Sequence, residues 1–198
     1  MQTYIKQLIE DSIRIKNDII SNPELIKNID NVVNKIIQCL KNNGKVLFCG
    51  NGGSAADAQH LAAELSGRFY LDRDPLFAEA LHVNTSYLTS VSNDYGYDEV
   101  YSRLVKGMGR KGDILIGLST SGNSKNIIKA FNMANEIGMN TVAMTGASGG
   151  ELKNICKYLI NVPSENTPRI QESHILIGHI ICEIVEDKIS NLSKDLKK

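Results

Sequence analysis

The sequence predicts a three-layer α/β protein in which an N-terminal helical arm precedes a doubly wound parallel sheet. Two observations support this fold class. Residues 1–43 carry apolar side chains at helical spacing and no strand signal. From residue 44 onward, short apolar runs bounded by glycine alternate with helical stretches, as in a parallel sheet covered on both faces. We expect one domain: the arm over 1–43, the sheet with its helices over 44–192, and a frayed polar tail over 193–198.

The arm is expected to consist of two amphipathic helices. Asn22-Pro23 separates them, because the residue before a proline is pushed out of the α region. The first helix gathers its apolar side chains on one broad face: Ile5, Leu8, Ile9, Ile13, Ile15, Ile19 and Ile20. Such a face must be buried against the rest of the fold or against another subunit.

The remaining elements follow in a regular order. Buried strands are expected at 46–49, 76–81, 114–118, 141–144 and 158–162. A glycine-rich turn at 50–54 leads into a helix that ends near residue 66, and a serine-rich turn at 119–124 leads into one that ends near residue 138. A long last helix is expected from about 168 to 190.

Composition excludes several classes of function. The 22 Lys and Arg residues balance the 22 Asp and Glu residues, and a nucleic-acid-binding domain usually has a basic excess. No apolar run is long enough to span a bilayer, and the charged N-terminus is unlike a signal peptide. Four cysteines without CxxC spacing indicate buried free thiols. We expect a cytoplasmic protein with no nucleic-acid or membrane partner.

The two turns that follow the first and third expected strands are candidate ligand loops, since ligands of open α/β sheets bind outside the carboxyl ends of the strands. The 119–124 turn places four hydroxyls around Gly122 where a helix begins: those of Ser119, Thr120, Ser121 and Ser124. Unpaired N–H groups at a helix N-terminus favour an anion. An ordinary helix cap is the alternative, but it needs fewer hydroxyls, so we predict a phosphate site.

The first turn fits a dinucleotide-binding pattern only loosely, through Gly50, Gly52 and Ala55. The acidic residues at the expected distance, Asp72 and Asp74, precede the second strand instead of ending it. A Walker A loop is absent, since no Gly-Lys-Ser/Thr follows the first turn. A small phosphorylated ligand is therefore favoured over a nucleotide.

His60 and Glu64 are four residues apart on the helix after the first turn, which places both side chains on one face. They could share a divalent metal such as zinc, act as an acid–base pair, or form a solvated surface pair. Gln171 and His179 are eight apart on the last helix, about 80° around it and roughly 12 Å along it. Either that helix is irregular, or the two residues serve the sites of different subunits, or only one is a ligand.

Five motifs together resemble the sugar isomerase (SIS) domain family, and within it the isomerases of phosphoheptoses. They are Cys49-Gly-Asn-Gly-Gly-Ser54, His60-x-x-x-Glu64, Ser92-Asn-Asp-Tyr-Gly96, Ser119-Thr-Ser-Gly-Asn-Ser124, and Arg169-Ile-Gln-Glu172 followed by His179. The resemblance implies a flavodoxin-like sheet and a homotetramer with sites at subunit contacts. The one departure follows Gly67, where 68–72 is less polar than in the family, and it leaves the role of Arg68 open.

The resemblance also implies site residues and one zinc ion per subunit. The implied zinc ligands are His60, Glu64, Gln171 and His179. The implied substrate-binding residues are Asn51, Gly52, Gly53, Glu64, Asn93, Asp94, Ser119, Thr120, Ser121, Ser124 and Gln171. The implied substrate is the sugar phosphate sedoheptulose 7-phosphate, converted to D-glycero-D-manno-heptose 7-phosphate as the first step of ADP- or GDP-heptose supply for lipopolysaccharide or capsule.

An aldose–ketose isomerase moves a proton between C1 and C2 through an enediol, so it needs a base and an acid–base group for the oxygens. Glu64 is the candidate base, and His179 is the candidate for ring opening and hydroxyl proton transfer, because imidazole titrates near neutrality. Zinc could polarise the oxygens or serve a structural role, and metal ligation competes with base action for the lone pairs of Glu64.

Two other functions fit a SIS fold. One is a non-enzymatic docking protein that binds the bacterial replication initiator, and the other is a sugar-phosphate-sensing module of a regulator. A docking protein has no need of His60, Glu64, Gln171 and His179 around one pocket, and no DNA-binding segment accompanies the domain. Isomerases of pentose or hexose phosphates are variants within the enzyme class.

Overall fold

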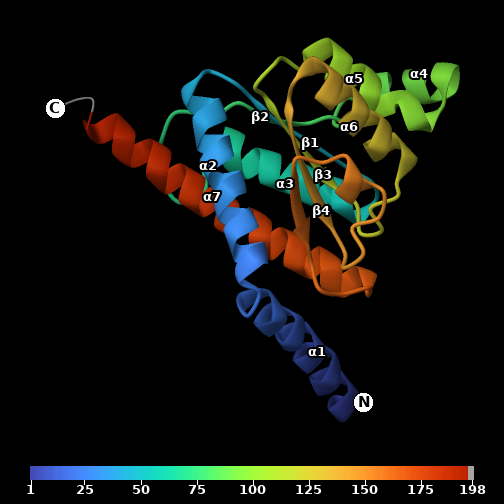
Figure 1. Ribbon diagram of the computed structural model, residues 1–198, viewed down its shortest axis with the longest axis vertical. Helices are drawn as coiled ribbons and strands as arrows, with labels where there is room; N and C mark the ends of the chain where they lie inside the picture. Colours follow the sequence, from blue (N-terminus) through green and yellow to red (C-terminus); the bar gives the residue numbers. More distant parts are fainter. Residues whose placement is uncertain (196–198) are drawn as a thin grey trace.

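Five parallel strands in the order β2-β1-β3-β4-β5 form the centre of the computed structural model, which describes the backbone of residues 1–195 and the side chains of residues 1–191 (Figure 1). The strands are β1 (Val46–Gly50), β2 (Ala78–Ala80), β3 (Ile114–Leu118), β4 (Asn140–Thr145) and β5 (Tyr158–Asn161). This is the flavodoxin-like order, and it confirms the predicted fold class. The strand order reverses between β1 and β3, where ligands of such sheets bind.

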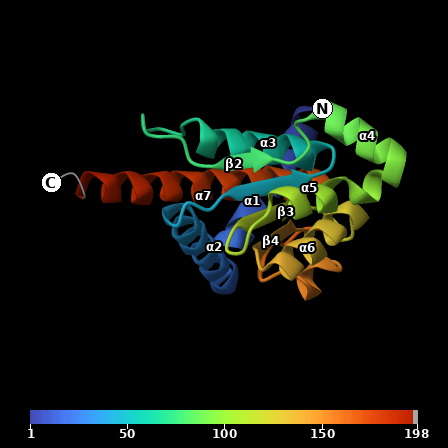
Figure 2. The ribbon, with the colours of Figure 1, turned by 90° about the horizontal axis from the view of Figure 1, so that it is seen from above.

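Helices cover both faces of the sheet (Figures 1 and 2). The helices are α1 (Gln2–Ile20), α2 (Pro23–Lys41), α3 (Gly53–Ser66), α4 (Thr85–Tyr95), α5 (Val100–Met108), α6 (Lys125–Ile137) and α7 (Thr167–Asp195), with short 3₁₀ turns η1 (Tyr97–Glu99) and η2 (Leu152–Asn154). One buried cluster joins the sheet to α2, α3 and α7, and a second joins the other face to α4, α5 and α6.

Strand β1 shows why both faces are closed. Val46 and Phe48 contribute to the α2–α3–α7 cluster, whereas Leu47 and Cys49 contribute to the cluster on the other face. Successive strand side chains point to opposite faces, so a strand that is apolar at every position is buried on both sides. Cys39, Cys49 and Cys182 are buried free thiols, as expected, whereas Cys156 is a free thiol that is only half-buried.

The helical arm breaks where it was predicted to break. Asn22 caps α2 by accepting a hydrogen bond from the backbone N–H of Leu25, and Pro23 occupies the first turn. Helix α2 buries its apolar stripe against the sheet, but α1 projects from the body of the protein (Figure 1). Of the seven apolar side chains on the α1 face, Ile15 and Ile19 are buried, while the others are exposed.

The middle of α1 is tied to the start of α7. Ser12 donates a hydrogen bond to Glu172 over 2.7 Å, and Arg169 donates to the carbonyl of Leu8 over 2.7 Å. Arg169 also pairs with Glu172 within α7. The arm therefore approaches the helix that carries Gln171 and His179.

Four elements differ from the sequence expectation. Strand β2 has three residues instead of the expected run of 76–81, and α4 and α5 fill a stretch for which no helix was expected. Helix α7 continues to Asp195, so the first three residues of the expected frayed tail are helical, and 196–198 lie outside the described residues. Among the helices described, none has the length and apolar character needed to cross a membrane.

Candidate active site

The two predicted ligand loops lie side by side, because β1 and β3 are neighbours and their ends are paired at Gly50 and Leu118. The first loop is held by Asn51. Its amide exchanges two hydrogen bonds with the buried Asn126 of α6, over 2.9 and 2.8 Å, and accepts a third from the hydroxyl of Tyr97 over 3.1 Å. Sequence reasoning missed Asn126 and Tyr97, since no motif connects either to the first loop.

No side chain of the serine-rich loop caps α6, although Asn126 within the helix accepts a hydrogen bond from the N–H of Ile127 over 3.0 Å. Ser124 is the N-cap residue, but its hydroxyl lies 3.0 Å from that of Ser119 instead of capping the helix. Gly122 has a positive φ of 67°, and a Cβ there would lie 2.2 Å from the carbonyl oxygen of Gly149. The ordinary-cap alternative therefore does not describe Ser124, and the helix N-terminus with its hydroxyls is suited to an anion.

A second group of candidate functional side chains lies further along α3. His60 and Glu64 project from one face, with Nε2 and Oε1 3.1 Å apart, and His179 of α7 brings its Nε2 to 3.2 Å from that of His60. One ligand atom from each of these three residues lies within 4.8 Å of the others. Below, we call these three residues the His–Glu–His group.

The geometry of the His–Glu–His group fits a divalent metal. In a tetrahedral site with zinc–nitrogen distances of 2.0–2.1 Å, neighbouring ligand atoms lie about 3.3 Å apart. The 3.1 and 3.2 Å separations in the group are close to that value. Two imidazoles and a carboxylate are also a donor set that zinc accepts.

Gln171 lies apart from this group in the protomer. Helix α7 is a continuous α-helix, so Gln171 and His179 are about 12 Å apart along its axis. The Gln171 amide instead lies at the N-terminus of α3, 3.5 Å from the hydroxyl of Ser54 and close above Gly53. Of the three possibilities left open by the sequence, an irregular helix is excluded.

A cleft of about 440 Å³ separates the start of α3 from the start of α7, and Gly53, Asp57, Gln171 and Glu172 are among its lining residues. Asp57 projects from α3 one turn before His60, and its Oδ2 is buried without a hydrogen-bond partner among the described residues. Burial raises the pKa of Asp57, while His60 and His179 oppose that shift. Sequence reasoning missed Asp57, although its spacing of three from His60 was a usable signal.

Asn93 and Asp94 lie at the exposed C-terminal end of α4, where the Asn93 amide donates to the Asp94 carboxylate over 2.9 Å. Tyr97, just beyond them, links this segment to Asn51 of the first loop. Arg68 is exposed beyond the end of α3.

A flavodoxin-like sheet with a hydroxyl-rich loop at its switch point and a nearby imidazole–carboxylate group defines a sugar isomerase (SIS) domain. The SIS domain family model matches residues 9–146. A phosphoheptose isomerase of Aneurinibacillus thermoaerophilus is 52% identical over 96% of both chains. One of Clostridium acetobutylicum is also 52% identical over 96% of both chains.

Solved structures agree with the sequence comparison. The phosphoheptose isomerase structure from Neisseria gonorrhoeae superposes with a TM-score of 0.88 at 44% identity, covering 94% of this chain and 98% of the other. The Francisella tularensis structure superposes with a TM-score of 0.89 at 38% identity over the same shares. The chain belongs to the phosphoheptose isomerase family of SIS domain proteins.

Proposed function

We propose that this protein interconverts sedoheptulose 7-phosphate and D-glycero-D-manno-heptose 7-phosphate. The observation that carries the proposal is that α3 connects the loops suited to an anion with the His–Glu–His group. Its N-terminus adjoins the anion-binding loops, and His60 lies about 10 Å further along it. In a linear 7-phosphate the reacting carbons, C1 and C2, are at the opposite end from the phosphate, so a substrate lying along α3 meets both.

The phosphate end would be held by neutral donors. We assign this role to the hydroxyls of Ser119, Thr120, Ser121 and Ser124 with the N-terminus of α6. Asn51, Gly52, Gly53 and Gln171 would bind the sugar chain from the first loop and the adjoining cleft. Asn93 and Asp94, beside Tyr97, would line the solvent-facing side of the substrate-binding site.

The isomerisation needs one carbon-bound proton to move and two oxygens to exchange roles. The Glu64 carboxylate takes the proton from C1 of the ketose, which leaves a 1,2-enediol, and returns it to C2. The oxygen on C2 gains a proton as the hydroxyl on C1 loses one, and His179 transfers this proton and opens the cyclic sugar. The result is an aldehyde at C1 and a hydroxyl at C2, so atoms and charge balance.

We propose that the His–Glu–His group holds one zinc ion per subunit, supported by its donor set and spacing. When bound, the ion supplies Lewis-acid stabilisation for the oxygens on C1 and C2. Gln171 is separated from His179 by two turns of α7, so we assign it to the substrate and not to the zinc of its own protomer.

We further propose a cytoplasmic homotetramer that supplies heptose for lipopolysaccharide or capsule. The exposed apolar face of α1 supports assembly, since an isolated helix of this kind would expose several isoleucines to water. The comparisons lend no support to the docking-protein alternative, because the relatives similar over nearly the whole chain are named as isomerases.

Turnover of sedoheptulose 7-phosphate, followed by NMR of the aldose product with and without a chelator, tests the function. We expect product from the purified protein, and we expect Glu64→Gln to lower kcat by about 10²–10⁴-fold. Glu136→Gln, an exposed change at the far end of α6, is the matched control and should retain activity.

Metal analysis of Glu64→Gln separates its two roles. A variant that binds zinc but does not turn over has lost the base, whereas one that recovers in excess zinc has lost a ligand. Near-full turnover by Glu64→Gln with its own metal would refute the base assignment. An inactive wild-type protein, loaded with zinc and assembled, would refute the proposed substrate.

A further inference from the structure

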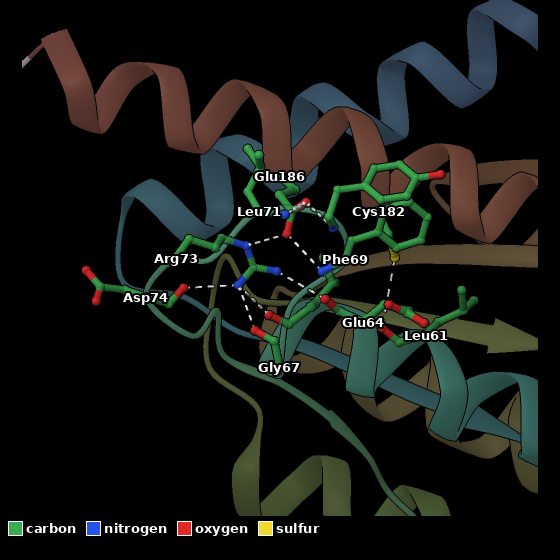
Figure 3. A network of polar contacts seen from close by, with 11 residues as sticks. Leu61, Glu64, Gly67, Phe69, Leu71, Arg73, Asp74, Cys182 and Glu186 are labelled. Carbon is green, nitrogen blue, oxygen red and sulfur yellow. Dashed lines mark hydrogen bonds and ion pairs between the residues drawn. The ribbon is translucent and has the colours of Figure 1, made fainter.

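A buried carboxylate lies two turns beyond His179 on α7. Glu186 is seven residues after His179, so both side chains project from the same face of the helix. Glu186 is only 1% exposed, and its oxygens accept hydrogen bonds from the backbone N–H groups of Phe69, Tyr70 and Leu71 over 2.9, 2.6 and 2.9 Å (Figure 3). One side chain of α7 thus fixes the segment that follows α3.

Arg73 joins this carboxylate to the end of α3. Its Nε lies 3.0 Å from Glu186, and its Nη atoms donate to the carbonyls of Glu64 and Leu65 over 3.1 and 3.0 Å and to that of Gly67 over 3.3 Å (Figure 3). The last carbonyls of a helix have no partner within the helix. Arg73 therefore holds the backbone of the residue that supplies Oε1 to the His–Glu–His group.

The segment held by Glu186 also contacts the group from its other side. The ring of Phe69 packs against the imidazole of His179, with 5.8 Å between centroids, and against Tyr70 at 4.5 Å. Two helices carry the His–Glu–His group, and the network contacts the group on both: the backbone of Glu64 on α3, and the ring of His179 on α7.

The charge on Glu186 is maintained by its partners. Burial opposes its ionisation, but the hydrogen bonds from Phe69, Leu71 and Tyr70, together with Arg73, outweigh burial and lower its pKa. An apolar or amide side chain at this position would leave buried donors without acceptors, which is costly.

We propose that Glu186 and Arg73 are positioning residues that set the separation of Glu64 and His179 and thereby the metal affinity and turnover of the His–Glu–His group. This inference rests on the proposed function for its kinetic consequence. Its consequence for metal binding stands on the network alone.

The test compares two variants of this network, Glu186→Gln and Arg73→Lys, with a control variant in a similar network elsewhere in the protein. Asp113 is also a buried carboxylate, 3% exposed, that accepts from two backbone N–H groups, those of Lys45 and Arg110, and from the Lys45 ammonium. It lies just before β3, at the amino ends of the strands, whereas the ligand loops lie at the carboxyl ends. Asp113→Asn therefore removes the same kind of interaction without touching the group.

Metal-free proteins are titrated with Co²⁺, whose visible absorption reports its coordination. We expect Glu186→Gln and Arg73→Lys to bind Co²⁺ roughly 10–100-fold more weakly than wild type with an altered spectrum, as when groups that orient metal ligands are removed. Asp113→Asn should lose thermal stability but bind Co²⁺ as wild type does. Wild-type affinity and spectrum in both test variants, or equal weakening in Asp113→Asn, would overturn the proposal.

Kinetics provides the second measurement. Both test variants should lower kcat for sedoheptulose 7-phosphate more than they change KM, because the phosphate loops lie at the other end of α3. If Glu186→Gln does not fold, Arg73→Lys, which keeps the charge but loses the fork geometry, carries the test. The Co²⁺ affinities of wild type and variants could rank as expected while the wild type shows no turnover of sedoheptulose 7-phosphate. In that case the proposed function fails and the positioning role remains.

Discussion

Asn51 illustrates how a single side chain prepares the candidate site. The Asn51 amide is already held by Asn126 and Tyr97, so the first loop is ordered before any ligand arrives. The spacing of His60 and Glu64 predicted their shared face correctly, because two residues of one helix suffice to define it. The partnership of His60 with His179, 119 residues away, depends on packing that no local pattern contains.

His174 gives a prediction at this scale. It is fully buried, its Nε2 lies 3.1 Å from the Thr145 carbonyl, and burial lowers its pKa from 6.5 to about 4. Only the unfolded chain takes up a proton at this residue between those values, so stability falls as the pH drops from about 6.5 toward 4. From pH 7 to pH 5 this residue should cost about 2 kcal/mol of unfolding free energy.

Chemical denaturation of wild type and His174→Gln at both pH values measures that cost. We expect the glutamine variant to be less stable at pH 7 but to lose about 2 kcal/mol less on acidification. An equal loss in both proteins would show that His174 does not carry this part of the acid sensitivity.

At the scale of elements, periodicity predicted most helices and strands that have a strong apolar pattern, but it missed α5, which buries Val100, Tyr101 and Val105. It gave no signal for α4, which buries only Val91 among its eleven residues and so has little apolar pattern to detect. Strand β2 shortened to three residues because it lies at the edge of the sheet and pairs with β1 alone. The serine-rich loop was recognised from composition, but its packing against Gly149 was not, since that contact is made across two loops.

The packing of this loop leads to a second prediction. Gly122→Ala should destabilise the protein by about 1–3 kcal/mol and raise KM, because the positive φ and the 2.2 Å approach to Gly149 leave no room for a Cβ. Gly107→Ala in α5 is the control, since a Cβ there meets nothing within 4 Å. It should leave KM unchanged and stabilise by about 0.5–1 kcal/mol. A Gly122→Ala enzyme with wild-type KM would show that this loop does not contribute to substrate binding.

At the scale of the whole molecule, the arm leaves apolar surface uncovered. Ile5, Ile9 and Ile13 of α1 are 49%, 55% and 51% exposed, and they follow one another at intervals of four residues. The sequence predicted this face and its need for a partner. It gave neither the direction in which α1 projects nor its hydrogen bonds to α7, because both depend on how α2 docks on the sheet.

Oligomeric state tests what covers the arm. We expect wild type to sediment as a tetramer and a variant with Ser at Ile5, Ile9 and Ile13 to dissociate into smaller species. The exposed change Glu10→Gln on the same helix should leave the mass unchanged. A monomeric wild type, or a triple variant of unchanged mass, would argue against assembly through α1.

The joining of α3 to α7 also fixes the order of events during synthesis. His60 and Glu64 leave the ribosome more than a hundred residues before His179, and the network that holds them waits for Glu186, later still. A nascent chain thus carries two of the three proposed metal donors without the third while more than a hundred residues are added. For the proposed metal ion we therefore expect capture by the complete group only after α7 has docked, as one of the last steps of maturation.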